Sequence, residues 1–246
     1  KTGGSSLSSV LKRNVDPSSI CPAGLIEQLL ELGESELSSF HYYSGHFGLA
    51  LPLALPLRKR FRLKMMTLLR DPVARSVSQI NAYYRNPGTY FHEFVRSVDC
   101  DVDKCLENPE LVQALANYQS KSLAIPLRLS RFRRRGLPVP SFQVLLARES
   151  LAYSDDQIFS RAISALRRCF FVALSEKMDE SVKRLTEIFD IPAVDFAPKV
   201  NVSSVNPDTG AKRAFDRRDL SGSALRRIED INLIDQRIYD SVLKEW

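Results

Sequence analysis

The fold is decided by the stretch Leu63-Lys64-Met65-Met66-Thr67-Leu68-Leu69-Arg70-Asp71-Pro72. Its near-continuous apolar character over 63–69 predicts a strand that is covered on both faces in a parallel sheet. Asp71 is well placed to act as the N-cap of the following helix. Pro72 suits the first helical position, where a missing N–H costs nothing. The stretch therefore predicts a buried strand that passes directly into a helix over 72–84.

Arg70 and Ser78 are the residues of this junction that suit anion binding. The guanidinium of Arg70 lies at the carboxyl end of the strand, and the hydroxyl of Ser78 lies about two turns into the helix. We expect them to hold one phosphate from both sides, with Arg75 either assisting or forming a surface ion pair. From this segment alone, an Arg70 that only pairs with a nearby carboxylate is an equal alternative.

The first residues of the chain form a second candidate anion site. Small and hydroxyl-bearing residues follow one lysine there: Lys1, Thr2, Gly3, Gly4, Ser5 and Ser6. This composition predicts a loop that runs into a helix over about 6–13. Backbone amides, hydroxyls and a lysine at a helix N-terminus suit a phosphate or sulfate group. The segment favours the anion-binding interpretation of Arg70.

Strands and helices alternate along the rest of the chain. Apolar runs predict further strands over 40–43 and 170–174. Periodicity and capping residues predict helices over 22–32 (ending at Gly33), 72–84, 89–97, 109–123, 154–168, 179–189 and 219–246. This order is typical of an α/β fold with a P-loop-type doubly wound parallel sheet, flanking helices and a helical C-terminal region. We expect a single domain over 1–246, with a preceding strand upstream of residue 1.

The chain is basic, with 246 residues, a net charge of +6 and a pI near 9.2. Basic residues cluster at 58–62 and 131–135, and the second cluster includes Arg133, Arg134 and Arg135. These clusters are either solvated faces or an approach surface for an anionic acceptor. Nucleic acid is not expected as a partner, because no recognised binding motif accompanies the charge.

Membrane spans and zinc sites are not expected. The longest apolar stretch, 47–57, is broken by two prolines, whereas a spanning helix takes roughly 20 apolar residues. Neither a CxxC pair nor a histidine at ligand spacing is present, so no metal is predicted. Cys100 and Cys105 are close enough in sequence to bridge in an oxidising compartment. The oligomeric state is left open.

Three motifs together indicate a resemblance to a known family. They are the opening Lys1-Thr2-Gly3-Gly4-Ser5-Ser6-Leu7, the Arg70-Asp71-Pro72 segment with Ser78 eight residues after its arginine, and Tyr43-Ser44-Gly45-His46-Phe47 between them. This combination resembles carbohydrate sulfotransferases, in particular the heparan sulfate 2-O-sulfotransferases and their bacterial counterparts. Segments 117–123 and 170–176 fit that family more loosely. The motifs spread from residue 1 to about residue 205, so the resemblance covers most of the chain.

The resemblance implies a donor and an acceptor. The donor is 3′-phosphoadenosine 5′-phosphosulfate, with its 5′ end in the loop 1–6 and Lys1 donating to the bridging oxygen. Arg70 and Ser78 hold its 3′-phosphate, and Lys199 and Ser203 lie where the family closes a loop over the nucleotide. The acceptor is a hydroxyl of a glycan or related molecule. The compartment is the cytoplasm for a bacterial enzyme, and the Golgi lumen behind an upstream anchor for a eukaryotic one.

His46 matches the histidine that serves as base in the 2-O-sulfotransferase motif. A neutral imidazole can take a proton from a hydroxyl at physiological pH, and Gly45 is expected to let the substrate approach closely. The chain departs from the heparan enzymes at Ser44, where they carry a second histidine, which puts the acceptor in doubt more than the reaction. His41 is expected to face elsewhere and to be structural, and His92 has no evident partner.

Two other classes of protein compete with the sulfotransferase. Lys1-Thr2 also suits the tail of a phosphate loop, so a P-loop nucleotide-dependent kinase or ATPase is the main alternative. Against this alternative, the predicted strand ends at Arg70, whereas a P-loop kinase or ATPase is expected to have a magnesium-supporting carboxylate at that position. A non-catalytic glycan-binding module is the second alternative, and the presence of both Lys1 and His46 argues against it.

Overall fold

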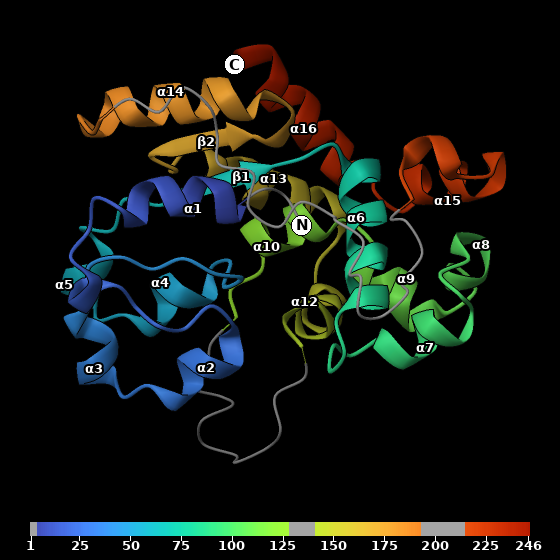
Figure 1. Cartoon of the computed structure of the whole chain (residues 1–246), viewed down its shortest axis with the longest axis horizontal. Helices are drawn as coiled ribbons and strands as arrows, with labels where there is room; N and C mark the ends of the chain where they lie inside the picture. The colour runs from blue at the N-terminus through green and yellow to red at the C-terminus, as the bar shows by residue number, and fades with distance from the viewer. Residues whose placement is uncertain (1–3, 128–140, 193–214) are drawn as a thin grey trace.

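The computed structural model describes residues 4–127, 141–192 and 215–246 of the chain. These residues form a mixed α/β structure that is mostly helical and contains a small parallel sheet (Figure 1). Strand β1 (Met66–Leu69) pairs in parallel with β2 (Phe171–Leu174), so that Met66 lies opposite Phe171 and Leu69 opposite Leu174. The strands expected over 63–69 and 170–174 are therefore confirmed, and both are shorter than predicted.

The described residues do not form the expected doubly wound sheet. The segment 40–43, predicted as a strand, contributes one isolated parallel bridge between Tyr42 and Ile20. The hydroxyl of Tyr43 donates to the carbonyl oxygens of Leu37 (2.6 Å) and Phe40 (2.9 Å), which ties this segment to the preceding helix. Local contacts of this kind hold the segment without a strand partner on β1.

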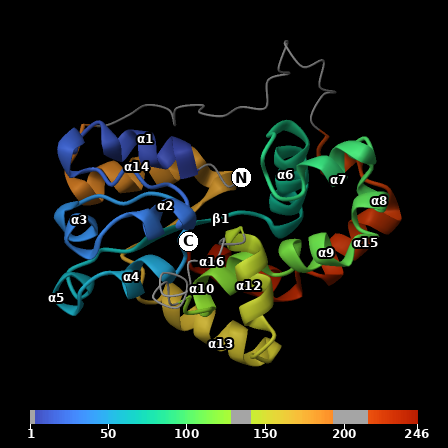
Figure 2. The same cartoon turned by 90° about the horizontal axis from the view of Figure 1, so that it is seen from below.

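Helices α1 (Gly4–Lys12) and α14 (Met178–Phe189) cover one face of the sheet. Leu7, Val10 and Leu11 of α1 share a buried apolar cluster with Phe171 and Ala173 of β2. Residues alternate between the two faces of a strand, so Met66 and Leu68 contact this cluster while Leu69 belongs to another. Figure 2 shows α1 and α14 together on one side of β1.

The opposite face of the sheet packs on a larger helical layer. Leu69 and Leu174 join its buried cluster. The helices of this layer are α10 (Tyr118–Ala124), α12 (Phe142–Ser150), α13 (Asp155–Leu166) and α16 (Leu233–Glu245). Either Ser154 or Asp155 was expected to cap α13, and the cap is Ser154, with Gln157 completing a capping box. Helices thus lie on both faces of the sheet, as is typical of a parallel sheet, although β1 is only half-buried over Met66 to Leu68.

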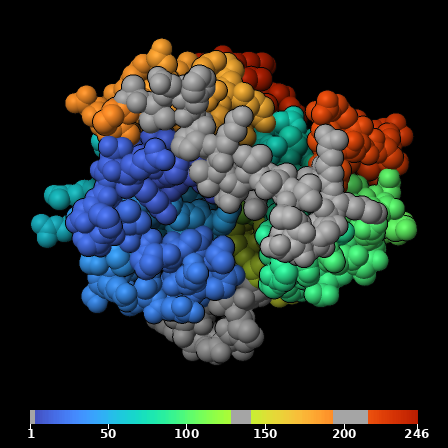
Figure 3. All heavy atoms as spheres, in the orientation of Figure 1, coloured from blue at the N-terminus to red at the C-terminus, as the bar shows by residue number. Residues whose placement is uncertain are grey.

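A second apolar cluster lies beyond the carboxyl end of β1. Its helices are α6 (Pro72–Arg85), α7 (His92–Ser97), α8 (Val102–Cys105), α9 (Pro109–Leu115) and α15 (Gly222–Asp230). Figure 3 shows the N-terminal region, blue, and these helices, green and red, on opposite sides of one face. The predicted helical C-terminal region is confirmed as α15 and α16.

The predicted helix over 22–32 is confirmed as the shorter α2 (Ile26–Glu31), which ends just before Gly33 as expected. Gly33 is also the N-cap of a helix that was not predicted, α3 (Glu34–Ser39). The predicted helix over 109–123 is divided into α9 and α10 at Asn117, which has a left-handed φ of 49°. Asparagine tolerates this conformation better than most residues. The short helices α4 (Ala50–Ala54) and α5 (Leu57–Arg60) complete the N-terminal part.

Candidate anion site at the carboxyl edge of the sheet

The junction between β1 and α6 has the geometry that the sequence predicts. Arg70 follows the last residue of β1, and Pro72 is the first residue of α6. The carboxylate of Asp71 accepts a hydrogen bond from the backbone N–H of Ala74 at 2.8 Å. Asp71 is therefore a true N-cap, and the chain turns from strand to helix with Arg70 at the carboxyl edge of the sheet.

Gln119 on α10 holds the main chain of Arg70 through both of its polar groups. The backbone N–H of Arg70 donates to Oε1 of Gln119 at 2.9 Å, and Nε2 of Gln119 donates to the carbonyl oxygen of Arg70 at 2.9 Å. Gln119 is 6% exposed, so these bonds are shielded from water. The amide side chain thus pairs with Arg70 much as a neighbouring strand would. Gln119 is a positioning residue that was not predicted, and only the polar character of segment 117–123 hinted at it.

Asp235 on α16 fixes in turn the start of α10. Its carboxylate accepts from the N–H of Gln119 (3.0 Å), the N–H of Ser120 (2.7 Å) and the hydroxyl of Ser120 (2.5 Å). Asn117 adds a second link, because its Oδ1 accepts from the N–H of Ile234 at 2.9 Å. Asp235 is 1% exposed. A buried carboxylate therefore does the capping that Asn117, in its left-handed conformation, does not do for its own helix.

Glu176 approaches Arg70 from the end of the neighbouring strand. Its Oε1 accepts from the N–H of Asp71 at 3.1 Å and lies 4.0 Å from Nε of Arg70. Its Oε2 accepts from the hydroxyl of Tyr239 on α16 at 2.9 Å. Burial lowers the pKa of Arg70, while the carboxylates of Glu176 and Asp71 raise it. The guanidinium remains charged at neutral pH, because the ordinary pKa of arginine exceeds 12.

Ser78 and Arg75 have different environments on α6. Ser78 is half-buried, about two turns after Arg70. Arg75 is 1% exposed, donates to the carbonyl oxygen of Leu115 at 3.0 Å, and lies 4.0 Å from the ring centre of Tyr118. Neither an assisting role at an exposed phosphate nor a surface ion pair fits these contacts. Arg75 instead stabilises the core between α6, α9 and α10.

The N-terminal segment is helical earlier than predicted. Gly4, Ser5 and Ser6 form the first turn of α1 and not a loop, and the side chain of Ser6 is buried. Lys1, Thr2 and Gly3 lie outside the described residues. A helix N-terminus is favourable for anions in either case, because its N–H groups and dipole point toward the ligand.

His46 lies on the wall of a groove of about 1170 Å³ between α1, the segment 41–52, β1 and α10. His46 is exposed, and its backbone N–H donates to the carbonyl oxygen of Gly24 at 3.0 Å. His41 lines the same groove, so the expectation that it faces elsewhere is wrong. Leu69 and Gln119 also line it, which places the Arg70 junction at its margin.

Gly45 is required for packing. A Cβ atom at this position would lie 2.3 Å from the carbonyl oxygen of Gly24, closer than real Cβ contacts. The glycine therefore lets the His46 segment pack on the backbone of Gly24, which gives it a structural reason beyond the substrate access that we expected. His92 is also explained, because its Nδ1 lies 2.8 Å from the carbonyl oxygen of Tyr83.

The remaining predicted positions divide into two groups. Lys199, Ser203, Arg133, Arg134 and Arg135 lie outside the described residues. In the cluster 58–62, Lys59 donates to the carbonyl oxygens of Ser38 and Phe40, and Arg60 donates to those of Leu53 (3.2 Å) and Leu55 (3.1 Å). Lys59 and Arg60 therefore tie α5 to the C-terminal ends of α3 and α4, whereas Arg58 and Arg62 of the same cluster are exposed.

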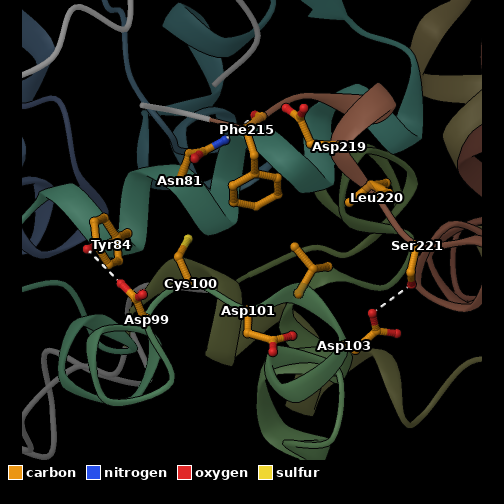
Figure 4. Close-up of a pocket in the computed structure, with 11 residues that line it drawn as sticks. Asn81, Tyr84, Asp99, Cys100, Asp101, Asp103, Phe215, Asp219, Leu220 and Ser221 are labelled. Carbon is orange, nitrogen blue, oxygen red and sulfur yellow. Dashed lines mark hydrogen bonds between the residues drawn. The ribbon is translucent and has the colours of Figure 1, made fainter. Parts of the chain in front are cut away.

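A second cavity, of about 350 Å³, lies between α6, the segment 99–103 and the segment 215–221 (Figure 4). Its carboxylates include Asp99, which accepts from Tyr84 (3.2 Å), and Asp103, which accepts from Ser221 (2.6 Å). Cys100 also lines it as a free thiol, and burial raises its pKa to about 12. The sequence analysis did not predict this cavity. A thiol held protonated is a poor nucleophile, so Cys100 is not a candidate nucleophile.

Comparison with known proteins assigns this chain to no family. No protein-family model, curated protein or solved structure matches it. Over the three described ranges, no group of histidine, cysteine, aspartate and glutamate side chains is arranged to hold a metal ion. Within the same residues, no helix combines the length and apolar character needed to cross a bilayer.

Proposed function

We propose that this chain is a sulfotransferase that moves a sulfuryl group from 3′-phosphoadenosine 5′-phosphosulfate to a hydroxyl of a glycan or related acceptor. The observation that carries the proposal is the fixed position of Arg70. Its main chain is held by Gln119, and the N-capped start of α6 follows it directly. A preorganised arginine at the carboxyl edge of a parallel sheet suits a ligand phosphate.

The donor side of the reaction would use groups from two helices. Sulfuryl transfer resembles phosphoryl transfer, where catalysis is mostly positioning and neutralisation of charge on the leaving group. The N-terminus of α1 with Lys1 would neutralise the 5′ end of the nucleotide. Arg70 and Ser78 would hold the 3′-phosphate, with Lys199 and Ser203 proposed as further contacts. The groups at the start of α1 would thus bind one end of the nucleotide, and the groups at the start of α6 would bind the other.

The acceptor side would use the groove that His46 lines. An acceptor hydroxyl must lose a proton during transfer, and an exposed imidazole on a groove wall can accept it. The groove also carries basic side chains at its rim, including Arg58, Arg62 and Lys64, which favour an anionic acceptor. Arg133, Arg134 and Arg135 are proposed to add to that attraction.

Transfer of labelled sulfate tests the proposal directly. Purified protein is incubated with the labelled donor and a panel of desulfated glycans, with and without EDTA. We expect transfer to at least one glycan, and we expect it to survive EDTA, because lysine, arginine and backbone amides can neutralise the donor without a bridging metal. Magnesium-dependent ATP turnover without sulfate transfer would support the kinase alternative and contradict the proposal.

A further inference from the structure

Carboxylates lie beside Arg70, the proposed contact of the phosphate. Among the described residues, Arg70 lies near the carboxylates of Glu176 and Asp71. Arg217 lies 3.7 Å from Asp71, but it also pairs with Glu229 at 2.9 Å. Among the described residues, Glu176 and Asp71 are thus the carboxylates that act on Arg70. A phosphate that binds Arg70 meets the repulsion of these two negative charges.

Glu176 is the carboxylate that is best placed to compete with a ligand. Asp71 is committed to the N-terminus of α6, where its hydrogen bond to Ala74 caps the helix. Glu176 is instead 37% exposed and lies 4.0 Å from Nε of Arg70, a distance at which the pair is weak and exchangeable. The backbone N–H of Asp71 and the hydroxyl of Tyr239 hold its two oxygens beside the guanidinium.

The anchors of Glu176 also keep it close when the ion pair is broken. Burial and the contact with Glu176 raise the pKa of Tyr239, so the phenol stays protonated and continues to donate. Glu176 follows β2 and Arg70 follows β1, and the parallel pairing of these strands sets the two residues side by side at one edge of the sheet. The pairing of the two strands therefore places the carboxylate of Glu176 beside Arg70, the residue proposed to bind the phosphate.

We propose that Glu176 is the resident counter-ion of Arg70, which the 3′-phosphate of the nucleotide displaces, and that it thereby limits how tightly the nucleotide binds. This inference rests on the proposed function. In the unliganded protein Glu176 neutralises a partly buried guanidinium, and in the complex it remains nearby as a like charge to the phosphate. The arrangement favours release of adenosine 3′,5′-bisphosphate, the product that keeps this phosphate after sulfuryl transfer.

A Glu176→Gln substitution separates this role from a purely structural one. Glutamine keeps an oxygen that can accept from the Asp71 N–H, but it removes the negative charge. By calorimetry, we expect Glu176→Gln to tighten adenosine 3′,5′-bisphosphate about three- to tenfold and to change AMP affinity less than twofold, the scale of one partly exposed ion pair. A structural role predicts the opposite, with weaker binding of both nucleotides.

Glu180→Gln is the matched control, because it removes the same charge one turn away. Glu180 pairs with Lys177 at 4.0 Å and lies on α14. Neither nucleotide should bind differently to this variant. If both variants tighten the bisphosphate equally, the effect is general electrostatics and the inference fails.

Nuclear magnetic resonance of the unmodified protein gives a second test that needs no variant. With ¹⁵N-labelled arginine, the Nε–H resonance of Arg70 should shift on addition of adenosine 3′,5′-bisphosphate and not on addition of AMP. A wild-type protein that binds both nucleotides equally would contradict the proposed function at Arg70. A wild-type preference that Glu176→Gln leaves unchanged or weakens would contradict the counter-ion role alone.

Discussion

The Arg70 junction and the His46 segment differ in how the fold places their functional side chains. At the junction, Gln119 binds both main-chain groups of Arg70, Asp71 caps α6, and Glu176 reaches over from the next strand. His46 lies on an exposed segment whose main chain packs on Gly24. The first region is held by side-chain hydrogen bonds, three of which join residues far apart in the sequence, and the second by close backbone contact.

This difference implies that nucleotide binding and turnover can be changed separately. Substitutions in the hydrogen-bond network behind Arg70 remove buried partners, so they must affect stability as well as the nucleotide. Substitution of the exposed imidazole removes no buried group, so it should leave the fold intact. Substitution of the proposed base should therefore lower activity without lowering stability. Substitution behind the proposed phosphate site should lower both stability and nucleotide affinity.

The largest expected effect is on turnover in the His46 region. His46→Ala should lower kcat by roughly 10²- to 10⁴-fold, the range for loss of a positioned general base, with donor affinity unchanged. Steady-state kinetics of sulfate transfer measures this. The unfolding free energy of the His46→Ala variant should stay within about 0.5 kcal/mol of wild type, because His46 is exposed.

His41→Ala is the control, since this exposed histidine lines the same groove. It should retain most of the activity. A His46→Ala enzyme that turns over within a few-fold of wild type, or a His41→Ala enzyme that loses more, would move the base away from His46.

The next effect is on stability behind the Arg70 junction. Asp235→Ala leaves the N–H groups of Gln119 and Ser120 buried without their acceptor. We expect the free energy of unfolding to fall by about 3 kcal/mol, as for other buried charged partners. Urea denaturation followed by circular dichroism measures it. Asp240→Ala, on the exposed face of the same helix, should change it by less than about 0.5 kcal/mol. Equal losses would mean that Asp235 does not organise the start of α10.

Gln119→Ala should have a smaller effect on stability and a specific effect on the nucleotide. It removes both hydrogen bonds to the main chain of Arg70, so we expect a loss of about 2 kcal/mol of stability and a reduced preference for adenosine 3′,5′-bisphosphate over AMP. Denaturation and calorimetry on one preparation measure both. The exposed Gln113 provides the control substitution to alanine. If the Gln119 variant keeps the full preference, main-chain positioning of Arg70 is not needed for binding.

The same contrast explains which features the sequence predicts. Asp71 as N-cap and Pro72 as first helical residue depend on neighbours within a few residues, so pattern alone predicts them. The link from Gln119 to Arg70 spans 49 positions, and that from Asp235 to Ser120 spans 115. No local pattern encodes such contacts.

The errors have the same origin. The predicted helix over 109–123 is periodic, but the tertiary bonds of Asn117 to α16 divide it. Phe40 to Tyr43 has strand-like composition, yet hydrogen bonds from Tyr43 to the preceding turn replace a partner strand. In both places long-range or side-chain contacts outweighed local propensity.

Calorimetric titration with adenosine 3′,5′-bisphosphate and with AMP is the most direct test of the central claim, that Arg70 binds a nucleotide 3′-phosphate. We expect the bisphosphate to bind more tightly by about 2 kcal/mol, the scale of a charge-assisted phosphate contact, and Arg70→Ala to abolish that preference. Arg70→Lys should retain part of it, because it keeps the charge but loses the planar donor pair. Equal affinity of wild type for the two nucleotides, or a preference that survives in Arg70→Ala, would contradict the account.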